Sequence, residues 1–218
     1  MTDIAINPVA DWGGHYIGTY NNGITGALRM MDAKHGFFRF NFSSIPAGNT
    51  CDFASLSVYN SNYALTNPVF NLYAITDDNG DWVEGTKNEA VAGAGEPCVN
   101  AKAADGSGGI TTAWATPLYV DTLLANYSYV GVIPVYTKIE LIFNAAGLAK
   151  LQTWFGQETN NGFYMHKASA GNCTILSREW SGAGQRPLLS FTHTAPSGAL
   201  LKVNMNAQMS NLTGGIRG

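Results

Sequence analysis

Apolar and polar residues alternate with a period of two along much of the chain. Residues 36–42 (GFFRFNF) place Phe38, Phe40 and Phe42 on one side and the polar Arg39 on the other, which is typical of a half-buried β-strand. Further segments of this kind are FASLSVY, VFNLYAI, YVGVIPVY, IELIF, GFYMHK, CTILS and PLLSFTH. Turn-forming clusters such as SSIPAGN, DDNGD, ADGSGG and TNNG separate them. Many short strands joined by glycine-rich turns predict an all-β fold, an antiparallel β-sandwich or jelly roll.

One segment departs from this alternation. In residues 144–156 (NAAGLAKLQTWFG), apolar side chains that include Leu151 and Trp154 recur at helical spacing. Asn144 is suited to the N-cap position, and Gly156 is suited to the end of a helix. The sequence therefore predicts one short helix that lies against the sandwich.

The order of these elements indicates one β-sandwich domain over residues 1–194, followed by a C-terminal extension over residues 195–218. The segment PLLSFTH reads as the last strand of that domain. Residues 89–116 are rich in alanine and glycine and show little periodicity. They predict a long loop, and long loops in compact domains often carry binding functions.

Composition narrows the class of protein. Of the 218 residues, 45% are hydrophobic and only 12% are charged, about half the charged share of an average protein. The net charge of −3 gives no electrostatic reason to bind nucleic acid or an anionic membrane. The N-terminal MTDIAINPVADW lacks the basic and apolar regions of a secretory signal, and no apolar run has the length of a bilayer span. We therefore expect neither a nucleic-acid partner nor a membrane partner.

The sequence lacks the common catalytic and metal-binding patterns. It contains no G-x-S-x-G, P-loop, G-x-G-x-x-G, H-E-x-x-H or EF-hand motif. Cys51, Cys98 and Cys173 stand far apart without a C-x-x-C pair, which argues against a zinc site. Buried free thiols are the main interpretation, and one disulfide with one leftover thiol is the alternative. The sequence thus predicts a protein that is not an enzyme and has no cofactor.

The most acidic stretch, TDDNGDWVEG, is a calcium candidate. Asp77, Asp78, Asp81 and Glu84 put four carboxylates close together in the sequence, and clustered oxygen ligands on a turn suit Ca²⁺. The simpler interpretation is a solvated turn whose Asp and Asn side chains cap their own backbone. We keep both interpretations.

Five aromatic residues outside the clearest strands are candidates for sugar binding: Trp12, Tyr16, Tyr20, Trp114 and Tyr119. Exposed Trp and Tyr rings stack on the apolar faces of sugar rings. The alternative is that they pack the ends of the sandwich or a subunit interface, where Trp and Tyr are also enriched.

The extension carries its own strand pattern. In residues 200–206 (LLKVNMN), apolar positions alternate with polar ones. A free segment of this kind would present an adhesive strand edge, so we expect it to dock on a partner, by strand addition for example. Its return onto its own domain is the alternative. The candidate partner-binding residues are Leu200, Leu201, Val203, Met205, Met209 and Leu212.

Four segments in sequence resemble DNRLRE-type domains, β-sandwich modules of bacterial surface and secreted proteins that also occur beside polysaccharide-degrading enzymes. The segments are RFNFSSIPAGNTCDFASLSVYNSN, VFNLYAITDDNGDWVEGTKN, IELIFNAAGLAKLQTWFGQETNNGFYMHKAS and ILSREWSGAGQRPLLSFTHT. The resemblance spans about residues 37–194 and implies a β-sandwich. It also implies that Glu179 and Arg186, which flank the WSGAGQ turn, form charge pairs within the domain. Some relatives bind polysaccharides such as alginate.

A sandwich without catalytic residues, a start without a secretion signal and an apolar tail together favour a virion protein. We expect a non-enzymatic structural protein of a bacteriophage particle, most closely a capsid decoration (cement) or fibre protein. Its partners would be a major capsid protein or further copies of itself, and it would be made in the host cytoplasm. The alternative is a carbohydrate-binding module or adhesin, extracellular or on a cell surface, that recognises a polysaccharide.

Overall fold

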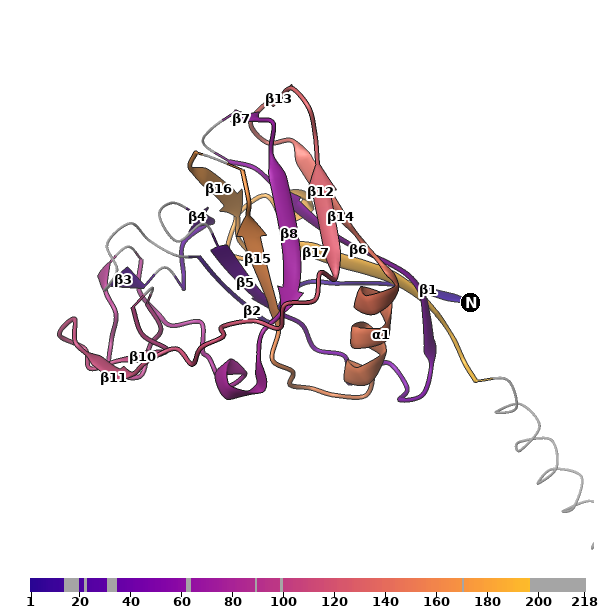
Figure 1. Cartoon of the computed structure of the whole chain (residues 1–218), viewed down its shortest axis with the longest axis horizontal. Helices are drawn as coiled ribbons and strands as arrows, with labels where there is room; N and C mark the ends of the chain where they lie inside the picture. Colours follow the sequence, from indigo (N-terminus) through magenta and orange to yellow (C-terminus); the bar gives the residue numbers. More distant parts are fainter. Residues whose placement is uncertain are drawn as a thin grey trace, which may run out of the picture.

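The computed structural model in Figure 1 describes residues 1–13, 20–21, 23–30, 35–61, 64–88, 90–98, 100–169 and 171–196. The six apolar tail candidates, from Leu200 to Leu212, lie outside the described residues, and so does the aromatic candidate Tyr16. No helix among the described residues has the length and apolar character needed to span a membrane.

Strands dominate the described chain. They are β1 (Thr2–Ile6), β2 (Ala10–Gly13), β3 (Tyr20–Asn21), β4 (Ala27–Met30), β5 (His35–Arg39), β6 (Thr50–Tyr59), β7 (Leu65–Thr66), β8 (Val69–Ala74), β9 (Ala90–Val91), β10 (Ala103–Ala104), β11 (Ile110–Thr112), β12 (Ala125–Ser128), β13 (Val132–Ile133), β14 (Lys138–Phe143), β15 (Phe163–Lys167), β16 (Cys173–Leu176) and β17 (Leu188–Thr194). The described helices are the 3₁₀ turns η1 (Asp77–Asn79) and η2 (Ala183–Gln185) and one α-helix, α1 (Ala145–Trp154).

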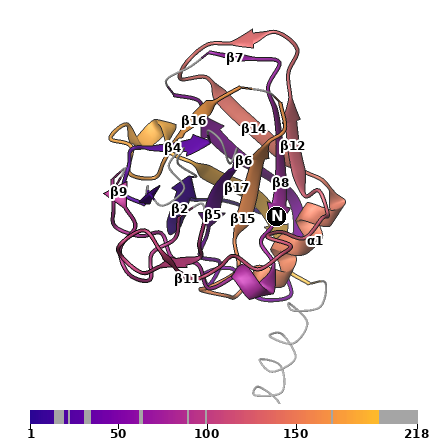
Figure 2. The ribbon, with the colours of Figure 1, turned by 60° about the vertical axis from the view of Figure 1, so that its left-hand side comes forward.

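Nine strands form one antiparallel sheet in the order β1-β17-β6-β14-β12-β8-β15-β5-β2. The sheet curls around the core, and the β16–β4 pair lies on the far side from α1 (Figures 1 and 2). The predicted all-β antiparallel fold is therefore confirmed. The last described strand, β17, ends at Thr194.

The main core lies inside the curled sheet. Phe38 and Phe40 are fully buried, as is Phe42 just beyond β5, whereas Arg39 between them is only partly buried. This confirms the predicted buried face of Phe38, Phe40 and Phe42, but Phe37 on the opposite face is fully buried as well. The aromatic rings continue to Phe163 of β15, whose centroid lies 6.1 Å from that of Phe40.

Helix α1 forms as its sequence predicts. The Asn144 side chain accepts a hydrogen bond from the amide of Gly147 at 3.0 Å, which caps the helix start. At the other end, Gly156 takes a left-handed conformation with φ of +83°, which only glycine adopts without strain. Leu151 and Trp154 are buried against the core.

A second, smaller core covers the outer face of β2, β5 and β15. Trp12, Phe37 and Trp82 are fully buried there, and Trp114 closes the cluster with its ring 5.3 Å from that of Phe37. Trp114 belongs to the predicted long loop, which contains only short strand pairs such as β10–β11. Trp114, Leu118 and Tyr119, which lie between β11 and β12, therefore cover this outer face.

The three cysteines are free and buried. Burial raises the pKa of the Cys173 thiol to about 12 and that of Cys51 to about 11. The main interpretation of the cysteines, as core thiols without a disulfide, is confirmed.

Candidate functional site

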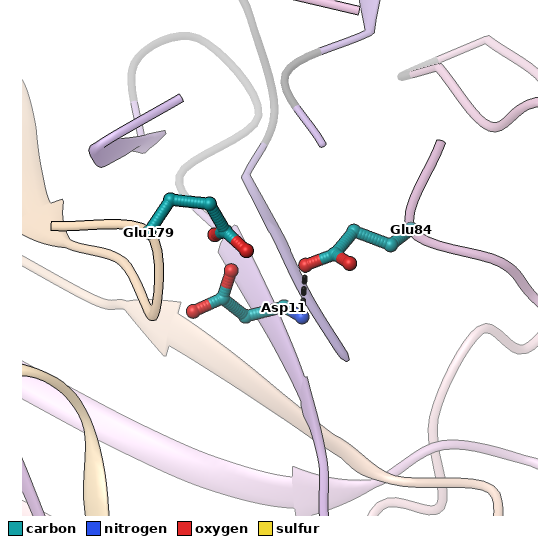
Figure 3. A group of neighbouring side chains, drawn as sticks. All are labelled: Asp11, Glu84 and Glu179. Atoms are coloured by element: carbon teal, nitrogen blue, oxygen red, sulfur yellow. Dashed lines mark hydrogen bonds between the residues drawn. The ribbon is translucent and has the colours of Figure 1, made fainter. Parts of the chain in front are cut away.

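A cluster of buried charges forms where three distant segments meet. Asp11 comes from β2, Glu84 from the loop after η1, and Arg178 and Glu179 from the loop after β16. One carboxylate oxygen from each of the three acids lies within 4.8 Å of the others. Figure 3 shows the carboxylates of Asp11 and Glu179 turned toward each other, with Glu84 approaching from the opposite side.

Asp11 reaches the cluster because it lies on the edge strand β2. Side chains alternate between the two faces of a strand, so Asp11 points away from the aromatic cluster that its neighbour Trp12 joins. The backbone of Asp11 pairs with Phe38 of β5, and its amide donates to Glu84 Oε1 at 2.9 Å. No part of Asp11 is exposed to solvent.

The backbone around Glu84 is fixed by Asn21. The Asn21 side-chain amide donates to the carbonyl oxygens of Glu84 and Pro97, at 3.0 and 2.9 Å. Its oxygen accepts from the amide of Lys87 at 3.2 Å. Gly85, which directly follows Glu84, has φ of +84°. A Cβ atom at this position would lie 2.4 Å from the side-chain amide nitrogen of Asn21. Glycine at this position lets the loop approach Asn21 closely enough to hold Glu84 in place.

Arg178 binds both glutamates. Its guanidinium donates two hydrogen bonds to Glu84, at 2.8 and 2.5 Å, a fork geometry that is among the strongest side-chain pairings. Its Nε also lies 2.9 Å from Glu179 Oε1, and its backbone amide donates to Asp11 Oδ2 at 2.7 Å. The hydrogen bonds to Glu84 are the main reason that the pKa of Arg178 is raised.

The cluster carries more negative than positive charge. When all three carboxylates are ionised, they and the one guanidinium leave a net charge of −2 beside the fully buried Asp11. Burial raises the pKa of Asp11 well above its ordinary value, and burial followed by the nearby Glu84 raises that of Glu179. Asp11 Oδ1 and Glu179 Oε2 are both buried acceptors without a hydrogen-bond partner. Chemically, the site is an oxygen-rich acceptor for a cation or a proton.

The four acidic candidates of TDDNGDWVEG do not gather. Asp77 accepts from the side chain of Asn161 at 2.5 Å. Asp81 pairs with Lys102 at 2.7 Å, and this hydrogen bond lowers its pKa. Asp78 is exposed. Only Glu84 turns inward, to residues that lie far from it in the sequence.

The aromatic candidates occupy different environments. Trp12 is wholly buried, so its ring packs the fold and has no face for a sugar, which corrects that interpretation. Trp114 is half-buried and donates to the carbonyl of Cys98 at 2.9 Å. Tyr20 is half-buried in β3. Tyr119 is half-buried and stacks on Tyr164, with centroids 4.6 Å apart and ring planes within 11°.

The sequence indicates Glu84 only as a calcium candidate of the acidic stretch, and it does not indicate Asp11 at all. Glu179 was expected to pair within the domain, and it does, with Arg178. Arg186, also expected to pair, donates instead to the carbonyl of Trp180 at 2.7 Å. Nothing in the stretch PVADWGG signals a buried carboxylate. One signal for part of the cluster is present in the sequence: Glu84 in WVEG and Arg178 in SREW carry opposite charges and can form an ion pair.

Comparison of the sequence with protein-family models and with curated proteins gave no match. The fold and the chemistry of the described residues therefore carry the functional interpretation.

Proposed function

We propose that this chain is a non-enzymatic structural subunit of an assembled particle, of the capsid decoration or fibre class, and that it joins neighbouring copies through its C-terminal segment. The supporting observation is an open sheet edge beside the point where the chain leaves the domain.

The open edge is β1. In the described part of the chain, β1 is the first strand of the nine-stranded sheet and pairs with β17 alone. Its Ile4 and Ile6 pack against the core yet stay partly exposed. An edge strand presents a row of unpaired amide and carbonyl groups, which is a template for pairing with another chain. A further strand along β1 would bury both isoleucines.

The register of β1 favours a partner from another copy. His193 pairs with Thr2, so the chain leaves β17 at the start of β1 (Figure 1). An antiparallel partner of β1 begins at the opposite end, beside Ile6. Within one copy, residues 195–200 would first have to run back along β1, roughly 15 Å. Between two copies, the segment does not have to run back along its own β1. Residues 200–206 of one copy can therefore add directly to β1 of the next copy.

The test compares the full chain with a chain that ends at residue 196, by sedimentation velocity from micromolar to millimolar protein. We expect the full chain to self-associate and the shortened chain to stay monomeric, with the same circular dichroism spectrum. Val203→Lys, on the apolar side of the predicted strand, should abolish association. Asn204→Lys, on the polar side, is the matched control and should retain it. A full chain that stays monomeric, or a shortened chain that still associates, would refute the proposal.

A specific observation favours a second candidate function, polysaccharide binding. Tyr73, Tyr119 and His166 are half-buried and lie together on the outer face of the sheet. The rings of Tyr73 and Tyr119 are 4.6 Å apart, and Asn71 donates to the hydroxyl of Tyr73 at 3.4 Å. Aromatic rings beside amide and imidazole groups are the chemistry that binds sugars.

Under this second candidate, Tyr119→Ala should weaken affinity for a bound polysaccharide, alginate being the first to try, by about tenfold. Affinity electrophoresis in gels that contain the polysaccharide measures this. Tyr129→Ala, at an exposed tyrosine that directly follows β12, is the control. Equal mobility of both variants and the unmodified chain, with and without polysaccharide, would rule the second candidate out.

A further inference from the structure

We propose that Asp11, Glu84 and Glu179 form a binding site for one divalent cation of the calcium class. The site is distinct from the acidic turn at residues 77–81, and it lies at the junction of β2 with the loops that follow η1 and β16.

The first support is the unpartnered oxygen of a fully buried side chain. Asp11 has no exposed surface, and its Oδ1 has no hydrogen-bond partner. A buried carboxylate oxygen left in this state is unfavourable unless a positive partner meets it. Glu179 Oε2, the other orphaned oxygen, belongs to the same cluster. Figure 3 shows the two carboxylates facing each other, so one ion between them satisfies both.

The second support is that the carboxylate oxygens differ in how many hydrogen bonds they already accept. Glu84 Oε1 accepts from both Asp11 N and Arg178 Nε, which fills its lone pairs, whereas Oε2 accepts from Arg178 alone. Arg178 therefore fixes one side of the glutamates and leaves an oxygen of each acid with unused capacity. A guanidinium that holds the ligands from behind orients them as outer-shell groups do in metal sites.

The third support is the agreement of charge, donor type and size. The net charge of −2 is balanced by one dication. All three donors are carboxylate oxygens, which hard cations prefer to the nitrogen and sulfur ligands of zinc or copper sites. Oxygens within 4.8 Å of one another fit a shared ion at about 2.4 Å from each, the calcium distance. Magnesium requires about 2.1 Å and a stricter octahedron.

The more exposed side of the cluster is formed by Arg178 and Glu179. The side chains of Glu179 and Arg178 retain 23% and 34% of their exposure, compared with 13% for Glu84. Because Asp11 lies beneath them, we expect an ion to enter past Glu179 and end against Asp11. A bound ion would tie the edge strand β2 to two loops that lie more than 70 residues away in the sequence.

Terbium luminescence tests the proposal on the full chain. Trp12 and Trp180 directly follow Asp11 and Glu179 in the sequence, so tryptophan excitation should sensitise a Tb³⁺ ion at the cluster. We expect one Tb³⁺ per chain, displaced by Ca²⁺. Asp11→Asn and the more exposed Glu179→Gln should each weaken binding by roughly 10- to 100-fold. Asp105→Asn is the control, because exposed Asp105 accepts hydrogen bonds only within its own turn.

Circular dichroism verifies that each variant is folded. If Asp11→Asn fails to fold, Glu179→Gln still tests the site. A wild-type chain that binds neither Tb³⁺ nor Ca²⁺ in direct equilibrium dialysis would overturn the proposal. So would cluster variants that bind as tightly as Asp105→Asn.

Discussion

Replacing Phe163 with alanine should lower the free energy of unfolding by about 3–5 kcal/mol. Phe163 is fully buried in β15 and joins the sheet to α1. Its ring centroid lies 4.9 Å from that of Trp154 on the helix and 5.5 Å from that of Phe143 on β14. Removal of the ring would leave a cavity between α1 and β14, where Trp154 and Phe143 now contact it.

Urea denaturation followed by tryptophan fluorescence measures this change. Phe53→Ala is the matched control, because Phe53 lies on β6 with 46% of its surface exposed and should change stability by less than about 0.5 kcal/mol. A loss below about 1 kcal/mol for Phe163→Ala would mean that α1 is not packed on the sheet as the structure has it.

Arg178→Met should be the most destabilising change at the carboxylate cluster, by about 2–4 kcal/mol when chelator keeps cations away. The variant removes the only guanidinium that contacts Glu84 and Glu179 in the described structure. Three carboxylates then face one another with no positive charge among them, and a buried charge without its partner is strongly unfavourable. We take the lower part of the usual range because about a third of the Arg178 side chain is exposed.

Thermal and urea unfolding in EDTA measure this effect. Lys138→Met is the control, because its pair with Glu140 is 3.3 Å long with both side chains over 40% exposed, and such surface pairs contribute at most about 1 kcal/mol. If Arg178→Met were no more harmful than Lys138→Met, the cluster would not be a coupled unit. Adding Ca²⁺ should restore part of the stability that Arg178→Met loses, since the ion replaces the missing positive charge.

Local signals explain the parts of the fold that the sequence predicts well. Helix α1 carries its own N-cap at Asn144, which bonds three residues ahead to Gly147, and a glycine at position 156 whose left-handed φ suits the end of a helix. The alternation around Phe38 and Phe40 likewise reports one buried face. These features depend on short-range spacing, which a single sequence displays directly.

The candidate site depends on long-range packing, which a single sequence does not display. Arg178 bonds to Asp11 across 167 residues and to Glu84 across 94. The sequence predicts either a calcium cluster or a solvated turn for Glu84 and its acidic neighbours, but Glu84 lies with Asp11 and Glu179, and Asn21 holds its backbone there. No local pattern distinguishes these two outcomes.

The sequence also does not show that both faces of β5 are buried. Trp12 and Phe37 are buried on the outer face of the sheet, where the ring of Trp114 packs against them. The alternation of residues 36–42 assigns Phe37 to the polar side, because strand periodicity describes a sheet with one covered face. The long loop that covers the other face shows no periodicity, so its position over the sheet could not be read from the sequence.

Strand addition at β1 between copies is tested most directly by cross-linking mass spectrometry on an equal mixture of unlabelled and nitrogen-15-labelled full chain. Lys202 is the only lysine in residues 197–218, and the amine of Met1 directly precedes β1. We predict cross-links between Lys202 and Met1 that contain one light and one heavy peptide. Cross-links confined to peptides of a single isotope, or none between these two amines, would contradict the account.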